Sequence, residues 1–334
     1  MTKGVFLMKI YAFEVREDEK DCFHLMSAKY HIEIECSSAC LTSEKIPLLE
    51  KCTAVSILGQ SNIGETEAAL LETQNINYLS TRSIGYNHID LKAAKDHHIH
   101  VCNSSYAPNG VADYTIMMIL LCLRKYKQAL WRTQCNDFSL DGLQGRELKD
   151  LTVGILGTGK IGTMVAKELS GFGCRLLAYD IHKNPTLADQ VTYMPLDEIY
   201  HQADIITLHM PLFESTYHMI NDDSIAKMKK GVVIINCARG GLSDVHALTR
   251  GIESEQIGAL GIDVLENEED IIHKNLKTDI FANRDMAYLR QFKNVVHTQH
   301  MAFYTDSAVK SMVEHGITGI LDMIQNKETS LQLC

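Results

Sequence analysis

Three glycines near the middle of the chain have the spacing of a phosphate-binding turn. They stand at Gly157, Gly159 and Gly162, directly after the apolar run 153–156, which predicts a strand, and they open a segment with helical apolar spacing. The first glycine permits a tight turn, the second lets a pyrophosphate approach the backbone, and the third lets the helix pack closely on the strand. The residues expected to bind a dinucleotide are therefore Gly157, Thr158, Gly159, Lys160, Ile161 and Gly162.

An aspartate at the end of the next predicted strand favours NAD(H) over NADP(H). Asp180 directly follows the predicted strand 175–179 and stands 23 residues after Gly157. A carboxylate at this place accepts hydrogen bonds from both hydroxyls of the adenine ribose and repels a 2′-phosphate. His182 and Lys183 lie just beyond and could weaken this discrimination. The sequence predicts NAD as the cofactor.

One arginine, one glutamate and one histidine follow three other predicted strands. They are Arg239, Glu268 and His300, after the strands 232–236, 259–265 and 294–298. Doubly wound sheets bind their ligands at the carboxyl ends of the strands, so we expect these side chains to converge. A guanidinium can bind a carboxylate and polarise the neighbouring carbonyl. An imidazolium can give a proton to the developing alkoxide, and a glutamate can hold the ring and favour its charged form. Such a set would suffice to reduce a 2-oxo acid.

Short apolar runs alternate with helical segments along the chain. The remaining predicted strands are 9–13, 54–58, 76–81 and 204–210, and the predicted helices include 64–74, 110–131 (one long helix) and 306–326. This alternation is typical of parallel sheets covered by helices. We therefore predict an α/β fold with doubly wound parallel sheets.

Composition indicates a soluble protein of two domains. The chain has 334 residues, of which 46% are hydrophobic and 22% charged, and its formal net charge is −10. An acidic balance argues against binding to nucleic acid or to anionic membranes. The longest apolar run, 116–123, is too short to span a bilayer, and residues 1–7 do not resemble a signal peptide. We expect a cytoplasmic protein without nucleic-acid or membrane partners.

The ten cysteines and fifteen histidines do not have the spacing of a metal site. There is no CxxC pair or HExxH motif, and Cys36 and Cys40 have no second pair to complete a site. We interpret the cysteines as reduced thiols that pack as small hydrophobic residues, and we expect no metal.

Several motifs resemble those of the NAD-dependent D-2-hydroxyacid dehydrogenases, from Met8 to about Lys327. Besides the glycine motif they are Arg-Ser-Ile-Gly-Tyr-Asn at 82–87, Tyr-Ala-Pro-Asn at 106–109, and the segments 209–212, 238–240, 263–268 and 300–305. The 31 residues between Glu268 and His300 are similar in length to those of the D-lactate dehydrogenase branch. That branch includes D-2-hydroxyisocaproate and aryl-lactate dehydrogenases and the D-lactate-forming enzyme of vancomycin resistance. Gln299 stands where the family usually has proline.

The resemblance implies roles for the matched residues. The catalytic residues would be Arg239, Glu268 and His300. The backbone N–H groups of Ile84 and Gly85 would bind the substrate carboxylate, and Tyr106 and Phe303 would face the substrate. Together with the glycine motif and Asp180, the cofactor would contact His209, Pro211, Ala238 and Asp263.

Leu58 is the expected determinant of substrate size. It lies where similar D-lactate dehydrogenases often carry tyrosine, so a leucine there would leave a wider, apolar pocket wall. The alternative is that Leu58 is only a core residue of its strand.

The resemblance also implies a domain layout. A discontinuous, flavodoxin-like substrate domain (8–107 and 304–334) would contain an inserted Rossmann NAD-binding domain (108–303). A cleft that closes by hinge motion would follow, and the family is usually dimeric through the cofactor domain. We therefore expect a homodimer.

These observations predict an NAD-dependent oxidoreductase that converts a 2-oxo acid to the D-2-hydroxy acid with NADH. The substrate would be of the pyruvate, 2-oxoisocaproate or phenylpyruvate class. One alternative is a strict D-lactate dehydrogenase. Another, from a different class, is an NAD-sensing corepressor-like binding protein, which would carry a long Pro/Ser-rich tail that this sequence lacks. A phosphoglycerate dehydrogenase would usually need an additional C-terminal domain, which we do not expect here.

Overall fold

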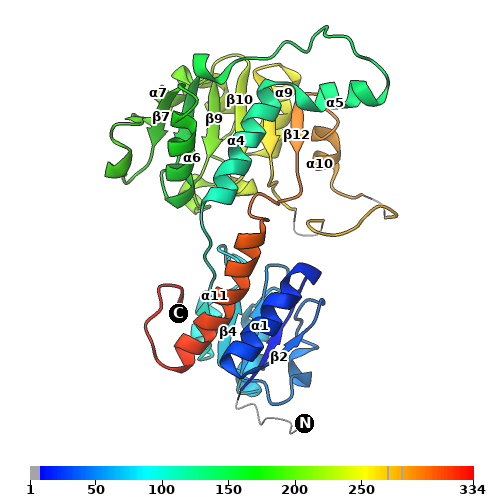
Figure 1. The fold of residues 1–334 in the computed structure, drawn as a ribbon, viewed down its shortest axis with the longest axis vertical. Helices are drawn as coiled ribbons and strands as arrows, with labels where there is room; N and C mark the ends of the chain where they lie inside the picture. Colours follow the sequence, from blue (N-terminus) through cyan, green and yellow to red (C-terminus); the bar gives the residue numbers. More distant parts are fainter. Residues whose placement is uncertain (1–7, 269–270, 280) are drawn as a thin grey trace. The chain divides into compact units, whose positions relative to one another are not determined.

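The chain folds into two compact units, each built around its own sheet (Figure 1). A computed structural model describes residues 8–268, 271–279 and 281–334. The described residues up to Ala107 and the segment Tyr304–Cys334 form the first unit, and Pro108–Phe303 form the second, which is thus inserted into the first. Within the described ranges, no helix is both long and apolar enough to cross a membrane.

The first unit contains a five-stranded parallel sheet in the order β2-β1-β3-β4-β5. Its strands are β1 (Lys9–Ala12), β2 (Glu33–Cys36), β3 (Ala54–Ile57), β4 (Tyr78–Thr81) and β5 (His100–Cys102). This is the order of flavodoxin-like folds. At the β5 edge, residues 331–334 run antiparallel: Leu333 N donates to Val101 O at 2.8 Å and Asn103 N donates to Leu331 O at 3.0 Å.

Four helices cover the two faces of this sheet: α1 (Lys20–Tyr30), α2 (Glu65–Thr73), α3 (Leu91–Asp96) and α11 (Asp306–Ile324). One core cluster joins α1 and α11 to β1 through side chains such as Phe23, Ile317 and Ile10. A second joins α2 and α3 to β3, β4 and β5 through Leu71, Ala93 and their neighbours. Because both faces are covered, β3 is buried at all four of its positions and β4 at three of four.

A buried ion pair ties together the ends of three strands in the first unit. Arg82 follows β4, and its Nε donates to Glu19 Oε1 at 2.9 Å; neither side chain is exposed. The same guanidinium donates to the carbonyl of Ser56 at 3.2 Å and of Phe13 at 2.9 Å. Since the Ile84–Gly85 turn begins two residues later, its starting point is fixed by this pair.

The second unit contains a seven-stranded parallel sheet in the order β12-β11-β10-β9-β6-β7-β8. Its strands are β6 (Thr152–Leu156), β7 (Arg175–Tyr179), β8 (Thr192–Tyr193), β9 (Ile205–Leu208), β10 (Val232–Asn236), β11 (Ile257–Ile262) and β12 (Val295–His297). This is the Rossmann order extended by one strand, and the strand order reverses between β6 and β9. The prediction of an α/β fold with two doubly wound parallel sheets is confirmed.

The helices of the second unit are α4 (Asn109–Leu123), α5 (Tyr126–Gln134), α6 (Lys160–Ser170), α7 (Leu196–Gln202), α8 (Asp222–Lys227), α9 (Val245–Glu253) and α10 (Arg284–Leu289). The prediction of one helix over 110–131 is wrong, because α4 ends at Leu123 and Lys125 has a left-handed φ of 50°. The carbonyl of Leu123 accepts from Arg146 N at 3.2 Å, so the returning chain takes the place of the next helical turn. A new helix, α5, then starts in another direction.

Candidate active site

The glycine turn has the geometry that a dinucleotide requires. Gly157 has a φ of 98°, and a Cβ there would come within 2.6 Å of the His209 carbonyl oxygen. A Cβ on Gly162 would collide with the Gly157 carbonyl, whereas Gly159 faces open space. The first and third glycines thus make the close turn and the close helix packing, and the second leaves room at the N-terminus of α6 for a pyrophosphate. Lys160 and Ile161 begin α6.

Asp180, predicted to bind the adenine ribose, lies against this turn, and its contact with the cofactor stays a prediction. Its Oδ2 accepts from Thr158 N at 2.6 Å and from Thr158 Oγ1 at 3.1 Å, and its Oδ1 accepts from His182 N at 2.9 Å. A carboxylate has about four acceptor positions and three are used here, so Asp180 keeps capacity for a ribose hydroxyl. Turn and carboxylate together fit the pyrophosphate and the adenine ribose of NAD.

The other residues predicted to contact the cofactor lie at the neighbouring strand ends. His209 and Pro211 follow β9, and Ala238 follows β10. Burial lowers the pKa of His209 to about 3, so the ring is neutral at pH 7, and its Nε2 lies 2.9 Å from Thr207 Oγ1. Pro211 is exposed, and its carbonyl accepts from Thr216 Oγ1 at 2.8 Å. Their contacts with the cofactor stay predictions.

Glu268 and His300 form a hydrogen-bonded pair. His300 Nδ1 lies 2.6 Å from Glu268 Oε1, and the other carboxylate oxygen accepts from Leu265 N at 2.8 Å. Glu268 is buried, while about a third (35%) of the His300 side chain is exposed. A carboxylate at Nδ1 orients the imidazole and leaves Nε2 for proton transfer.

The turn that carries His300 is held by Asp263. The Asp263 carbonyl accepts from His300 N at 2.8 Å. The Asp263 carboxylate accepts from Met301 N at 2.9 Å, Ala302 N at 2.7 Å and Thr298 Oγ1 at 2.6 Å. The Asp263 side chain is completely buried. The structure therefore gives Asp263 a part in placing His300, and its predicted contact with the cofactor stays a prediction.

Arg239 lies on a tight turn after β10. The buried side chain of Asn236 closes this turn: its Nδ2 donates to Arg239 O at 2.9 Å, and its Oδ1 accepts from Ala238 N at 3.0 Å. Arg239 Nη1 donates to the Ala238 carbonyl at 2.6 Å. A Cβ on Gly240 would collide with the backbone of residues 265–266, so this turn packs directly on the segment that leads to Glu268. The sequence analysis did not assign Asn236, whose signal is an amide at the end of an apolar strand.

In the first unit, two hydroxyl groups join Leu58 to the predicted carboxylate loop. The half-buried Leu58 follows β3, and its carbonyl accepts from Thr81 Oγ1 at 2.6 Å and from Ser83 Oγ at 3.0 Å. Ser83 Oγ also lies 2.6 Å from the Gly85 carbonyl oxygen. Leu58 and Gly85 therefore meet at the carboxyl ends of β3 and β4.

Ile84 and Tyr106 complete the predicted substrate residues of this unit. The Ile84 carbonyl accepts from Asn103 Nδ2 at 2.9 Å, which ties the loop to the end of β5. Tyr106 lies partly buried just beyond β5. The other predicted substrate residue, Phe303, belongs to the second unit, where its ring is perpendicular to that of His300 with centroids 6.4 Å apart.

Glu14, which the sequence analysis missed, shapes the loop after Leu58. Its carboxylate accepts from the backbone N–H groups of Gly59 and Gln60, both at 2.7 Å, and of Ser61 at 3.0 Å. Burial opposes its ionisation, but these hydrogen bonds outweigh burial and lower the pKa of Glu14. Since its partners lie some 45 residues away along the chain, no local pattern could have identified it.

Comparison with known proteins places this site in a family. Residues 116–302 match the model of the D-isomer specific 2-hydroxyacid dehydrogenase NAD-binding domain. The chain is 42% identical to an aromatic 2-oxoacid reductase of Clostridium sporogenes, over 92% of this chain and 93% of that protein. The chain belongs to the D-isomer specific 2-hydroxyacid dehydrogenase family.

Two further matches extend over nearly the whole of this dehydrogenase. It is 36% identical to a D-specific alpha-keto acid dehydrogenase of Enterococcus faecium, over 96% of this chain and 98% of that one. Its fold is similar to the NAD-complexed D-isomer specific 2-hydroxyacid dehydrogenase of Lactobacillus delbrueckii ssp. bulgaricus, with a TM-score of 0.84, 30% identity, and coverage of 98% and 100%. The predicted family, the NAD cofactor and an NAD-dependent oxidoreductase acting on D-2-hydroxy acids are confirmed.

Proposed function

We propose that this dehydrogenase reduces 2-oxo acids with large side chains, such as phenylpyruvate and 2-oxoisocaproate, at least as efficiently as pyruvate. The observation that carries the proposal is Leu58, a half-buried apolar residue at the carboxyl end of β3, whose carbonyl accepts from Ser83 Oγ directly before the predicted carboxylate loop. A leucine here leaves space that a tyrosine would fill. The name of the Clostridium sporogenes relative, aromatic 2-oxoacid reductase, also supports the proposal.

In this proposal each residue acts on one part of the substrate. The Arg239 guanidinium and the N–H groups of Ile84 and Gly85 bind the carboxylate, and the guanidinium polarises the adjacent carbonyl. His300 gives the proton at Nε2 to the carbonyl oxygen while Glu268 holds Nδ1. NADH, when bound at the glycine turn, supplies the hydride.

Leu58→Tyr is expected to shift preference toward pyruvate. Each buried methylene of the substrate contributes about 0.8 kcal/mol, so a benzyl or isobutyl group can raise kcat/KM several-fold to about a hundredfold over a methyl group. A tyrosine at position 58 would occupy that space. The measurement is kcat/KM of the unchanged, Leu58→Tyr and volume-matched Leu58→Met enzymes with pyruvate, 2-oxoisocaproate and phenylpyruvate.

Two results of this panel would contradict the proposal. If the unchanged enzyme uses pyruvate at least about tenfold more efficiently than both larger acids, it is a strict D-lactate dehydrogenase. If Leu58→Tyr and Leu58→Met give the same preference as the unchanged enzyme, Leu58 is only a core residue.

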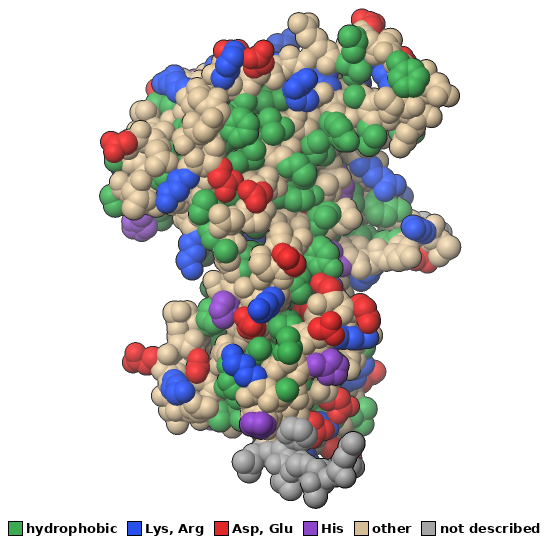
Figure 2. Space-filling view, viewed as in Figure 1, with side chains coloured by type: hydrophobic (Ala, Val, Ile, Leu, Met, Phe, Trp, Pro, Cys, Tyr) green, Lys and Arg blue, Asp and Glu red, His purple; other side chains and the backbone are tan. Residues whose placement is uncertain are grey.

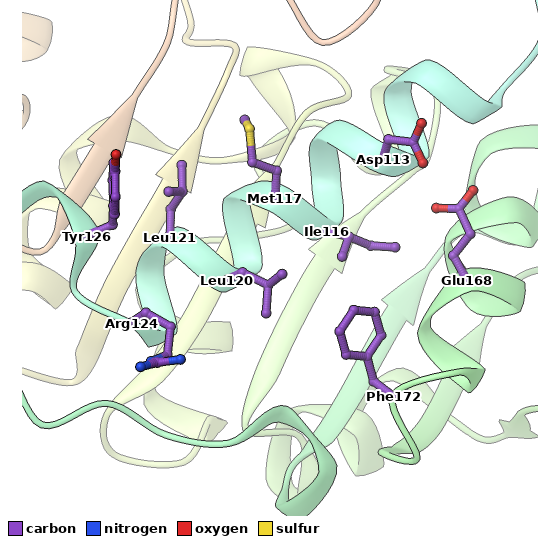
Figure 3. A pocket seen from close by; sticks show the side chains of 9 residues that line it. All are labelled: Asp113, Ile116, Met117, Leu120, Leu121, Arg124, Tyr126, Glu168 and Phe172. Atoms are coloured by element: carbon purple, nitrogen blue, oxygen red, sulfur yellow. The ribbon is translucent and has the colours of Figure 1, made fainter.

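We further propose that the protein is a homodimer formed through its NAD-binding unit. An apolar hollow of about 640 Å³ lies between α4, α5 and α6, lined by Ile116, Met117, Leu120, Leu121, Tyr126 and Phe172 and rimmed by Asp113, Arg124 and Glu168 (Figure 3). Figure 2 shows hydrophobic side chains gathered over α4. On and beyond α5, Trp131 and Leu140 are 70% and 84% exposed. Exposed apolar groups this numerous mark an interaction surface, and a second copy of the same face would cover them.

Replacing Met117 and Trp131 together by glutamate is expected to convert the dimer to a monomer, because four charges would then be buried at a two-fold interface. The measurement is the molar mass in solution by light scattering. The control is Leu48→Glu in the first unit, because the Leu48 side chain (72% exposed) is about as exposed as that of Trp131. This variant should leave the molar mass unchanged. A monomeric unchanged protein would contradict the proposal.

We propose a cytoplasmic location. Nine cysteines are free thiols: Cys22, Cys36, Cys52, Cys102, Cys122, Cys135, Cys174, Cys237 and Cys334. Free thiols in such number are typical of proteins from reducing compartments.

A further inference from the structure

His273 reaches back to the backbone of His300. It lies in the long segment between Glu268 and His300, and its Nε2 is 3.1 Å from the His300 carbonyl oxygen. A carbonyl oxygen only accepts hydrogen bonds, so Nε2 carries the proton and donates it. The two ring centroids are 6.2 Å apart, and the His273 ring is also 6.2 Å from that of Phe303.

The backbone of His300 needs this kind of support. Its φ of 55° is in the left-handed region, which is costly for a residue with a side chain and persists only where the surroundings fix it. Asp263 fixes the backbone N–H of His300 through its carbonyl. Its carboxylate fixes the backbone N–H groups of the two following residues, Met301 and Ala302. His273 supplies a hydrogen bond on the carbonyl side.

Contacts therefore hold both the imidazole ring and the backbone of His300. Glu268 bonds Nδ1, and the rings of Phe303 and His273 lie beside it. A rotation of the His300 peptide would move the ring and change where Nε2 points. Proton transfer depends steeply on that direction, because a misplacement of about 1 Å can cost about a hundredfold in rate.

We infer that His273 is a positioning residue for the reaction: its Nε2–H bond to the His300 carbonyl fixes the direction of the His300 imidazole toward the substrate. The inference rests on the proposed role of His300 as proton donor. It also gives residue 273, which precedes α10 and β12 in the chain, a role beside that of Thr298 in holding the His300 turn.

The test compares His273→Met with His273→Gln. The two side chains are of similar length, and both lack the aromatic ring, but only glutamine has an N–H donor. We expect His273→Met to lower kcat for 2-oxo acid reduction about tenfold and to enlarge the solvent deuterium isotope effect, with the Kd of NADH unchanged. His273→Gln should keep kcat within about threefold of the unchanged enzyme. Equal thermal unfolding of both variants excludes a general loss of structure.

Three outcomes would overturn the inference. The first is an unchanged kcat for His273→Met. The second is an equal loss for both variants, which would assign the effect to the ring. The third is that His273→Met lowers kcat by the same factor in the His300→Ala enzyme as in the unchanged enzyme. A residue that acts through His300 should have no effect on kcat once the His300 side chain is removed. Failure of the proposed function is a separate result, because it would appear as a preference of the unchanged enzyme for pyruvate over both larger acids. Failure of the proposed role of His300 would appear as a fully active His300→Ala enzyme.

Discussion

The His300→Ala enzyme is expected to reduce 2-oxo acids about 10²–10⁴-fold more slowly than the unchanged enzyme, which is the usual size of a general-acid contribution. The paired Glu268 carboxylate at 2.6 Å holds the ring for this proton transfer, and alanine removes the donor entirely. Binding of NADH should be unaffected, because the glycine turn lies between β6 and α6. The measurements are kcat with the preferred 2-oxo acid and the Kd of NADH by fluorescence.

His246→Ala is the matched control, since His246 is an exposed histidine of α9 and its loss should leave kcat unchanged. A fully active His300→Ala enzyme would show that the proton comes from another group. A large loss of NADH affinity would show instead that His300 serves cofactor binding.

Arg82→Met is expected to destabilise the first unit by about 3–5 kcal/mol, because the completely buried Glu19 carboxylate loses its 2.9 Å ion-pair partner and keeps only the longer, 3.9 Å pair with Arg16. The single tryptophan, Trp131, belongs to the second unit, so its fluorescence would not report this change. Hydrogen exchange of the β1, β3 and β4 amides should therefore be followed, and it should become much faster.

Two further variants separate the buried charge from lost packing. Arg82→Met with Glu19→Leu should recover much of the loss, because an apolar pair replaces the ion pair. Lys92→Met breaks the exposed Lys92–Asp96 pair and should change exchange hardly at all. A single Arg82→Met variant with normal exchange would contradict the importance of the pair.

The parts of the fold that could be predicted are those with a local signal. Strand β10 is buried at all five positions, and its apolar run predicted its bounds correctly. Strand β2 escaped prediction because Glu33 and Glu35 interrupt it at a sheet edge, and β8 because two residues carry no periodicity. The end of α4 was missed because Arg146, which replaces the next helical turn, comes from a distant loop.

In the site, too, residues with a local sequence signal could be predicted and residues placed by distant contacts could not. The glycine motif, Asp180 and the Glu268–His300 pair follow predicted strands, and topology alone brings strand ends together. The supporting residues have no such signal. His273 meets His300 from an irregular segment, and Glu14 meets a loop some 45 residues away. Their roles depend on tertiary contacts that no spacing in the sequence encodes.

The two edges of the five-stranded sheet differ in how they resist aggregation. An unpaired edge strand offers free N–H and C=O groups to another chain. Edge strand β2 carries Glu33 and Glu35, with Lys9 2.7 Å from Glu35, and such charges repel an added strand. Edge strand β5 has the apolar Val101 and Cys102 and is covered by residues 331–334 instead. Resistance of the β5 edge to aggregation therefore depends on residues 331–334, which take no part in the chemistry. When they detach, the unpaired N–H and C=O groups of β5 are exposed to strand pairing with another molecule.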